Sequence, residues 1–289
     1  MSLTEPKKIK LLKKIYITGF NGYLGSALCP LLKNYSLVKI GNPDSKKRDE
    51  NVLYSVPKKI EKNSICIHLA SISGELSESN RKKTYDTNVE LTKKLCDLGF
   101  EKFFFISSSS VYGNSDKPFL EDSDLNPSSY YSETKILSEE IVKKIKKNII
   151  LRMSILMGIS PRTNWKMFIN SIIKNINENK KSDIYGLETY RPYLNVNDAA
   201  EGLCKIITNK EVSGIFNFGF SDMNFNKMDI IKKIMNKYPS SKFNTKKNLD
   251  NPNYPTTKRS YKLNCEKIEK IIDKKRDLNF TIQEIADVF

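Results

Sequence analysis

The stretch KIYITGFNGYLG, residues Lys14 to Gly25, decides the fold that we expect for this chain. Its first half is an apolar run typical of a buried strand, and its second half places three glycines at the mouth of a helix. Glycines at such a turn let the backbone approach a pyrophosphate, whose negative charge is favourable at a helix N-terminus. The stretch therefore predicts a dinucleotide-binding turn, with these candidate cofactor-binding residues: Gly19, Gly22, Tyr23, Leu24 and Gly25.

Strand-like and helix-like segments alternate after this turn. We expect strands at 36–40, 64–70, 102–110 and 148–156, and helices at 23–33 and 88–98. A further helix around Lys135 has an apolar stripe formed by Leu137, Ile141 and Ile145. Such alternation predicts an α/β fold of the Rossmann type, with a doubly wound parallel sheet.

The alternation loosens after Gly158, which predicts a smaller C-terminal substrate-binding domain. We expect a flexible basic tail over residues 1–14, a Rossmann domain over 15–158 and a mainly substrate-binding part over 159–289. Within that last part, 190–220 is expected to return to the Rossmann sheet. A helix capped by Asn226 is also expected.

Composition excludes several classes of protein. The net charge of +16 in 289 residues comes mainly from lysines scattered along the whole chain, and no nucleic-acid motif accompanies them, so we expect no nucleic-acid partner. No apolar run is long enough for a membrane span, so we expect no membrane partner. Five cysteines without CxxC spacing argue against disulfides and a metal site, and indicate a cytoplasmic protein.

The sequence YYSETK, residues 130–135, contains a candidate proton-transfer pair. In a helix, residues four apart share a face and residues five apart do not, which selects Tyr131 over Tyr130 as the partner of Lys135. A phenol has an ordinary pKa near 10, so a base at neutral pH needs its anion stabilised by about three units, or roughly 4 kcal/mol. We expect the Lys135 ammonium and an oxidised nicotinamide to supply that stabilisation.

Several motifs occur in one order: GxxGxxG at Gly19, HLA at His68, NV at Asn88, a serine run before VYG, YxxxK, RPYLNVND at Arg191 and FNFG at Phe216. This set resembles the extended short-chain dehydrogenase/reductases, and within them the NAD-dependent epimerase/dehydratase family that works on nucleotide sugars. The resemblance extends from Ile15 to about Phe218. It implies a small-molecule nucleotide-sugar substrate, NAD or NADP as cofactor, and a homodimer formed through a helix pair that includes the YxxxK helix.

The resemblance also implies roles for residues. Catalytic roles fall on Ser108, Tyr131 and Lys135, and the last two also contact the cofactor, together with Leu69 and Ala70. Substrate binding falls on four residues: Asn88, Ser108, Arg191 and Arg259. Ser107 to Ser110 could also simply satisfy backbone groups at the end of a strand.

Departures from the family pattern narrow the reaction. Family dehydratases and decarboxylases have acidic residues immediately before VYG, where this chain has Ser109 and Ser110, so we expect no elimination step. Hydride chemistry at C4 of a hexose remains, as a 4-epimerase or a 4-keto sugar reductase. The serine-rich run favours the epimerase, and the short link between the second strand and ICIHLA is similar to the reductases. A non-catalytic dinucleotide-binding sensor or scaffold is a further alternative.

The cofactor choice is open between NAD and NADP, with NAD favoured. The second strand ends at Gly41, where an acidic residue would hold an NAD ribose, and Lys46, Lys47 and Arg48 follow. Ile155 stands where the family tends to place a substrate-contacting Asn.

Overall fold

The computed structural model describes residues 13–46, 48–209, 211–241, 243–246 and 259–289. Residues 1–12, most of the basic tail expected from the sequence, lie outside this set, as does Lys47. Within the described residues, no helix combines the length and the apolar character that crossing a membrane requires.

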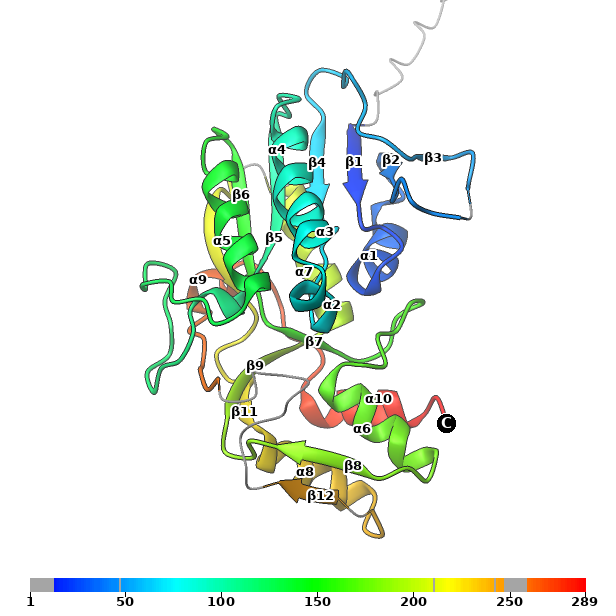
Figure 1. Ribbon diagram of the computed structural model, residues 1–289, viewed down its shortest axis with the longest axis vertical. Coiled ribbons are helices and arrows are strands. Elements are labelled where there is room, and N and C mark those ends of the chain that lie inside the picture. The colour runs from blue at the N-terminus through cyan, green and yellow to red at the C-terminus, as the bar shows by residue number, and fades with distance from the viewer. Residues whose placement is uncertain (1–12, 47, 210, 242, 247–258) are drawn as a thin grey trace, which may run out of the picture.

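A seven-stranded parallel sheet forms the larger part of the molecule (Figure 1). Its strand order is β10-β6-β5-β4-β1-β2-β3, which is the doubly wound arrangement that the sequence predicts. Along β1 the side chains alternate between two cores, because successive residues of a strand point to opposite faces. The strands are β1 (Lys14–Thr18), β2 (Ser36–Ile40), β3 (Val52–Leu53), β4 (Ile65–His68), β5 (Lys102–Ser108), β6 (Asn148–Met153) and β10 (Gly214–Phe218).

Helices cover both faces of this sheet. One face carries α1 (Tyr23–Leu28), a 3₁₀ turn (Cys29–Leu32) and α7 (Val196–Thr208). The other face carries α4 (Leu91–Cys96) and α5 (Tyr130–Val142). The helix expected at 88–98 begins earlier than the sequence suggests, with α2 (Glu75–Ser79), α3 (Arg81–Tyr85) and a π-helical turn (Asp86–Glu90) preceding α4.

The expectation that α5 packs through an apolar stripe is wrong. Leu137 is 47% exposed, whereas the face turned to the protein is mainly polar and includes Thr134, Ser138 and Glu139, each completely buried. These polar groups can be buried because each has a hydrogen-bond partner. Hydrogen bonds therefore determine which side of α5 faces the sheet, and a hydrophobicity pattern does not detect such bonds.

The smaller part of the molecule lies beyond the carboxyl ends of the strands (Figure 1). A three-stranded sheet joins β7 (Ile155–Met157), β9 (Tyr190–Asn195) and β11 (Asn224–Asn226), while β8 (Ser182–Tyr185) pairs with β12 (Phe243–Lys246). The helices are α6 (Phe168–Asn177), α8 (Lys227–Lys237), α9 (Glu266–Glu269) and α10 (Leu278–Ala286). As predicted, the Asn226 side chain caps α8, accepting a hydrogen bond from the backbone of Asp229. Within 190–220, β10 lies in the large sheet and β9 in the small one.

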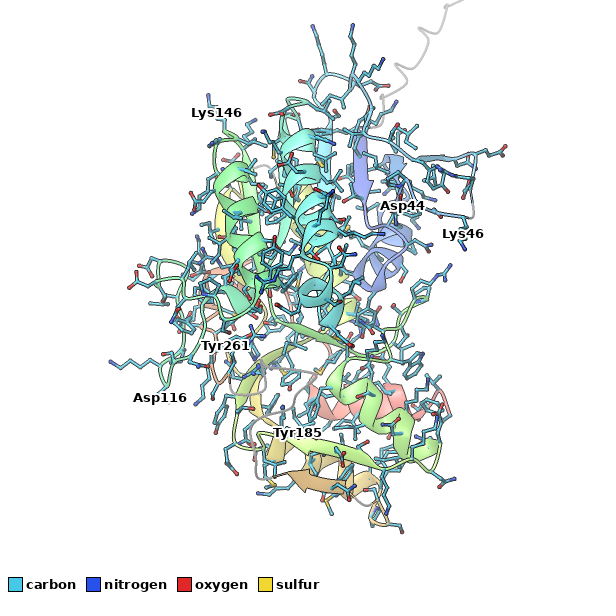
Figure 2. The ribbon with its side chains drawn as sticks, in the orientation of Figure 1. Asp44, Lys46, Asp116, Lys146, Tyr185 and Tyr261 are labelled. Atoms are coloured by element: carbon cyan, nitrogen blue, oxygen red, sulfur yellow. The ribbon has the colours of Figure 1, made fainter. Side chains whose placement is uncertain are left out.

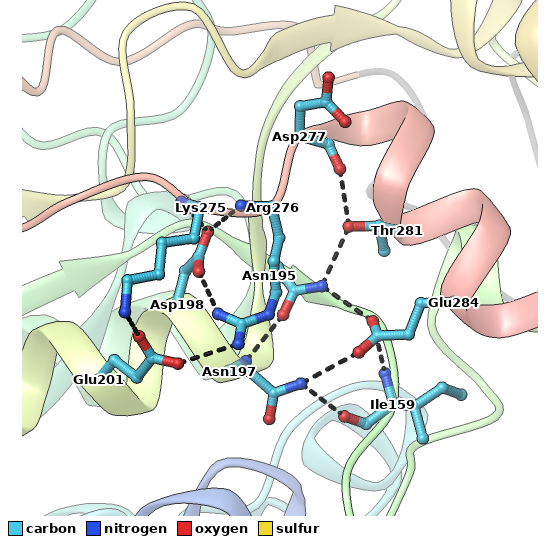
Figure 3. A network of polar contacts seen from close by, with 10 residues as sticks. All are labelled: Ile159, Asn195, Asn197, Asp198, Glu201, Lys275, Arg276, Asp277, Thr281 and Glu284. Atoms are coloured by element: carbon cyan, nitrogen blue, oxygen red, sulfur yellow. Dashed lines mark hydrogen bonds and ion pairs between the residues drawn. The ribbon is translucent and has the colours of Figure 1, made fainter.

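A polar network fixes α10 against the junction of the two parts (Figure 3). The Glu284 carboxylate accepts hydrogen bonds from the side-chain amides of Asn195 (3.0 Å) and Asn197 (3.2 Å). Asn195 also donates to Thr281 on α10. Nearby, Arg276 pairs with Asp198 and Glu201 of α7. These contacts join the C-terminal segment to the end of β9 and to α7, so the small part is held at the end of the sheet where the candidate site lies.

Candidate active site

The glycine turn after β1 packs directly on the loop after β4. Gly19 has a φ of +67°, and a Cβ there would come within 2.7 Å of the backbone nitrogen of Ala70 and 2.8 Å of the carbonyl carbon of Leu69. A Cβ on Gly25 would overlap the carbonyl oxygen of Gly19. Only glycine therefore allows these backbones to lie so close together, and the turn is shaped for a phosphate group at the start of α1.

A cavity of about 1230 Å³ opens along the ends of β1, β2 and β4. Its walls include the glycine turn and the loop after β4, which hold the sequence-predicted cofactor residues Gly19, Gly22, Leu69 and Ala70. A cavity of this size, with a glycine cradle, fits a dinucleotide. The side chains of two further predicted residues have structural roles: Leu24 is buried in the core, and the Tyr23 hydroxyl donates to the carbonyl of Gly158 (2.6 Å). Their contacts with the cofactor stay predictions.

The predicted catalytic residues lie together. Ser108 ends β5, Tyr131 is the second residue of α5, and Lys135 follows one turn later. The hydroxyls of Ser108 and Ser71 lie close enough to the phenol of Tyr131 to lower its pKa. Lys135 Nζ donates to the carbonyl of Ile106 (2.7 Å) and lies 5.7 Å from the centre of the Tyr131 ring. The structure thus brings a phenol, a hydroxyl and an amine to one point at the carboxyl end of the sheet.

Ser71 is a residue that the sequence analysis missed. It follows HLA directly, so its place at the end of a central strand was the available signal. Its contact with Tyr131 joins segments that are distant in the sequence, so spacing alone does not predict it.

The acid–base balance differs from the expectation for Tyr131. Burial raises the pKa of this phenol, against a lowering by the Ser71 and Ser108 hydroxyls and by the Arg259 charge. Burial also lowers the pKa of Lys135 to about 7, with the Glu139 carboxylate acting in the opposite direction. The lysine is therefore only partly charged at neutral pH, and the protein alone keeps Tyr131 protonated.

His68 has a structural role. It is 1% exposed, with Nδ1 2.6 Å from the Thr18 hydroxyl and Nε2 2.9 Å from the Thr92 hydroxyl. Burial, followed by the charge of Lys135, lowers the pKa of His68 to about 3. The imidazole is therefore neutral at neutral pH and holds the ends of β1 and β4 beside the glycine turn.

Asn88 supports the site from behind. It is 1% exposed, and its side chain bonds both backbone groups of Ile72 and the Thr134 hydroxyl (2.8–3.0 Å). These bonds tie the loop after β4 to α5, which gives Asn88 a positioning role. The substrate role of Asn88 stays a prediction.

Cationic side chains gather on the substrate side. Arg191 on β9 donates to the carbonyls of Tyr190 (2.8 Å) and Arg259, and its guanidinium lies 5.2 Å from the centre of the Tyr261 ring. Arg259 has a buried Nε and Nη1 that no hydrogen bond satisfies among the described residues. Its charge also acts on Tyr131. Figure 2 shows Tyr261 where the larger and smaller parts meet.

Lys227 is a third cation of this group and was not predicted. It is the first residue of α8, and its Nζ donates to the carbonyl of Tyr185 (2.6 Å), a residue labelled on β8 in Figure 2. Burial, followed by the charge of Arg191, lowers the pKa of Lys227 to about 8. No carboxylate pairs with Lys227 or Arg259 in the described part of the chain. Lys227 and Arg259, together with Arg191 next to them, form an anion-binding surface, which we call the cation group.

Comparisons with known proteins agree with this geometry. A family model, "NAD dependent epimerase/dehydratase family", matches residues 15–219. The dTDP-4-dehydro-6-deoxyglucose reductase of Escherichia coli is 34% identical over 140 residues, or 46% of this chain and 44% of that protein, so the match spans under half of that relative. An uncharacterized UDP-glucose epimerase of Bacillus subtilis is 26% identical over 238 residues, or 70% of this chain and 74% of that protein.

Solved structures share the fold over nearly the whole chain. The UDP-glucuronic acid 4-epimerase of Bacillus cereus, in complex with UDP-glucuronic acid and NAD, has a TM-score of 0.77 at 22% identity. That comparison covers 96% of this chain and 100% of the other. The UDP-glucose 4-epimerase of Thermus thermophilus, in complex with NAD, has a TM-score of 0.76 at 16% identity and the same coverage.

The family model covers most of the chain and includes the glycine turn, the serine run and the Tyr131–Lys135 pair. The fold, the cofactor cradle and the comparisons are consistent with one another. The chain belongs to the NAD-dependent epimerase/dehydratase family and is an enzyme of that family.

Proposed function

We propose that this enzyme transfers hydride at C4 of a nucleotide-linked hexose, as a 4-epimerase. The observation that supports this most strongly is the set of groups around Tyr131, which are hydroxyls and an amine. Ser109 bonds the Tyr261 hydroxyl (3.1 Å), and Ser110 bonds Ser108 (2.9 Å), so neither position offers a carboxylate for elimination. Hydride transfer needs only one proton carrier, which Tyr131 provides.

Each catalytic residue has a task in this reaction. A bound nicotinamide supplies the hydride acceptor or donor. Tyr131 takes the proton of the sugar hydroxyl during oxidation and returns it during reduction, and Ser108 holds the reacting oxygen beside the phenol. Lys135 adds positive charge next to Tyr131, which favours the phenolate while it exists. The nicotinamide also carries positive charge when oxidised, so the raised pKa of Tyr131 applies to the protein alone.

A 4-keto sugar reductase is the second candidate. The relative that is 34% identical to this chain is a reductase. In addition, the link after β2, which contributes β3, is short, as in the 4-keto sugar reductases that the sequence resembles. A reductase would use one hydride and release both products.

One assay separates these functions. The enzyme is incubated with NAD, NADP or their reduced forms and a panel of UDP- and dTDP-hexoses and their 4-keto derivatives. Inverted C4 stereochemistry without net cofactor turnover supports the epimerase, and stoichiometric NAD(P)H oxidation supports the reductase. If no sugar reacts although NAD binds, the proposal fails in favour of a dinucleotide-binding sensor.

We propose that the cation group of Arg191, Arg259 and Lys227 binds the phosphates of the substrate. Replacing Lys227 with Met is expected to raise KM for the nucleotide sugar by about tenfold, with kcat changed less, because a uniform binding contact is lost. Met keeps an apolar stem of similar length and removes the ammonium, which lies 5.5 Å from the centre of the Phe168 ring. Lys232→Met, an exposed position on the same helix, is the control. Equal KM values for the two variants would remove Lys227 from substrate binding.

Cofactor choice has a physical basis at Gly41. A Cβ at this position would lie 2.8 Å from Val52 Cγ1 and 3.0 Å from the Tyr54 ring, so the acidic residue that holds an NAD ribose has no space there. Arg48 lies instead at the cavity wall, 4.2 Å above the centre of the Tyr54 ring. A guanidinium in this place suits a 2′-phosphate.

Replacing both Lys46 and Arg48 with Ala is expected to weaken NADPH binding by about tenfold, since charge-assisted contacts to a phosphate are lost, and to leave NADH binding unchanged. Fluorescence titration of the two cofactors measures this. A double variant at exposed Lys58 and Lys59 is the control for net charge. An equal loss for both cofactors would show that Lys46 and Arg48 do not distinguish them.

A homodimer and a cytoplasmic location remain proposals. The exposed Leu137 on the outer side of α5 supports pairing through this helix, and light scattering measures the oligomeric state. The five cysteines are all free thiols, which suits a reducing compartment, and cell fractionation tests the location.

A further inference from the structure

Four serine hydroxyls form a continuous hydrogen-bonded chain beside Tyr131. Ser108 Oγ lies 2.9 Å from Ser110 Oγ, and Ser132 Oγ donates to Ser110 Oγ at 2.9 Å. Ser129 Oγ then lies 2.8 Å from Ser132 Oγ. We call these four residues the serine relay.

The two ends of the serine relay lie in different surroundings. At the inner end, the Ser108 hydroxyl lies beside the phenol of Tyr131 and lowers its pKa. The middle members are buried, with Ser110 6% and Ser132 0% exposed. At the outer end, Ser129 precedes the first residue of α5 and is only partly buried. The hydroxyls therefore connect the catalytic phenol with the protein surface.

Backbone donors leave the hydroxyl protons free to point toward Tyr131. The backbone nitrogen of Ser110 donates to Ser108 Oγ (3.2 Å), and the backbone nitrogen of Ser132 donates to Ser129 Oγ (3.2 Å). Each of these oxygens already accepts a bond and can give its own proton to the next group inward. The bond from Ser132 to Ser110 has the same direction. The relay is therefore oriented to deliver a proton to a phenolate.

We propose that the serine relay returns a solvent proton to Tyr131 each time Tyr131 has given its own proton to the sugar oxygen. This inference rests on the hydride chemistry proposed above. When the sugar carbonyl carbon receives hydride, its oxygen takes the Tyr131 proton. The phenolate then takes the Ser108 proton. Each hydroxyl farther out gives its proton to the next one inward, from Ser110 to Ser108, from Ser132 to Ser110 and from Ser129 to Ser132. Ser129 takes its proton from water or a buffer acid, so one reduction consumes one solvent proton.

The relay has different consequences for the two candidate reactions. An epimerase recovers on Tyr131, in its oxidative half, the proton that it donates in its reductive half, so a path to solvent is not required for turnover. A one-way reductase loses a proton from Tyr131 in every cycle and must replace it. Turnover by a reductase therefore depends on the relay. In an epimerase, the relay would only exchange the Tyr131 proton with solvent while the keto intermediate is bound, and turnover would not depend on it.

The first test measures proton exchange without a sugar. The protein, saturated with NAD and labelled with ¹³C at tyrosine Cζ, is studied by NMR in mixed H₂O and D₂O, where slow exchange of the Tyr131 hydroxyl splits its signal. Tyr131→Phe assigns the signal. Ser110→Ala is expected to slow the exchange by about tenfold or more, and Ser110→Thr, which retains a hydroxyl, is expected to restore it. An unchanged exchange rate in Ser110→Ala would overturn the proposal.

Ser109→Ala is the matched control for this test. Ser109 is adjacent in sequence and 1% exposed, but its hydroxyl bonds Tyr261 and lies outside the relay. Its replacement is expected to leave Tyr131 exchange as in the wild type. A slowing equal to that of Ser110→Ala would mean that any small cavity in this region has the same effect, and the proposal would be wrong.

The second test uses turnover with a 4-keto nucleotide sugar and excess NADPH. Tyr131 begins each experiment protonated, so Ser110→Ala is expected to complete its first turnover at the wild-type rate and then to run about tenfold slower. Imidazole, a small proton donor, is expected to raise the slow phase. Slowing of the first turnover as well, or a steady state as fast as in the wild type, would contradict the relay. If the wild type reduces no sugar, the reductase proposal fails, and the exchange rates still decide the relay.

Discussion

Replacing Tyr131 with Phe is expected to lower kcat by about 10²-fold or more, because the change removes the proton carrier and nothing else. The ring of Tyr131 remains next to Lys135, whose Nζ lies 5.7 Å from its centre and is held by the carbonyl of Ile106. Binding of NAD is therefore expected to change little. Steady-state kinetics on the sugar that the panel identifies, together with NAD titration, measure both quantities.

Tyr130→Phe is the matched control, because Tyr130 is the adjacent residue and its ring lies 4.8 Å from the Arg81 guanidinium, away from Lys135. This variant is expected to keep most of the wild-type kcat. Near-normal turnover in Tyr131→Phe would exclude Tyr131 as the acid–base group. Equal losses in the two variants would show that the region responds to any change in packing.

The sequence predicts the larger part of the fold because its signals are local. The apolar run before Gly19 and the glycines after it specify a strand, a tight turn and a helix within twelve residues, and β1 and α1 form there. Gly99 ends the helical segment before β5 with a φ of +75°. The alternation of strands and helices then leaves few sheet topologies open, since parallel connections are right-handed.

The candidate site is only partly predictable, because only some of its contacts join residues that are close in the sequence. The spacing of Tyr131 and Lys135 is local, so a helical turn suffices to place the two residues together. Ser71 and Lys227 reach the site only through tertiary packing. The pKa of Lys135 is set by burial, which a sequence pattern does not measure. Proximity in sequence therefore identifies the pair, and the folded structure determines its charge.

The face of α5 that packs on the sheet could not be predicted either, because its buried groups are polar and depend on partners that are distant in the sequence. Glu139 is 0% exposed and accepts bonds from Arg152 Nη2 (2.9 Å) and from the Ser107 hydroxyl. Arg152 on β6 also donates to the Tyr112 hydroxyl (2.9 Å) and the carbonyl of Glu121 (2.9 Å). This ion pair joins α5 to β5 and β6, the elements that carry Lys135 and Ser108. The polar face is buried because these partners exist, and its stability depends on all of them.

Glu139→Gln is accordingly expected to lower the free energy of unfolding by about 3–5 kcal/mol, because the Arg152 charge remains buried without its carboxylate. Urea denaturation measures this change. Glu140→Gln is the control: Glu140 is the next residue, is exposed and pairs with Lys143, so a loss of about 0–1 kcal/mol is expected.

The double variant Glu139→Leu with Arg152→Leu tests whether the ion pair itself raises the free energy of unfolding. The alternative is that stability falls only when one charge is removed and the other stays buried. Removal of both charges is expected to restore much of the stability lost by Glu139→Gln, since well-packed apolar groups often replace a buried ion pair without loss. The double variant is nevertheless expected to have a lower kcat, because Ser107 loses its partner next to Ser108 and Lys135 loses the carboxylate that raises its pKa. Stability restored together with full wild-type kcat would mean that the pair has no part in positioning the catalytic residues.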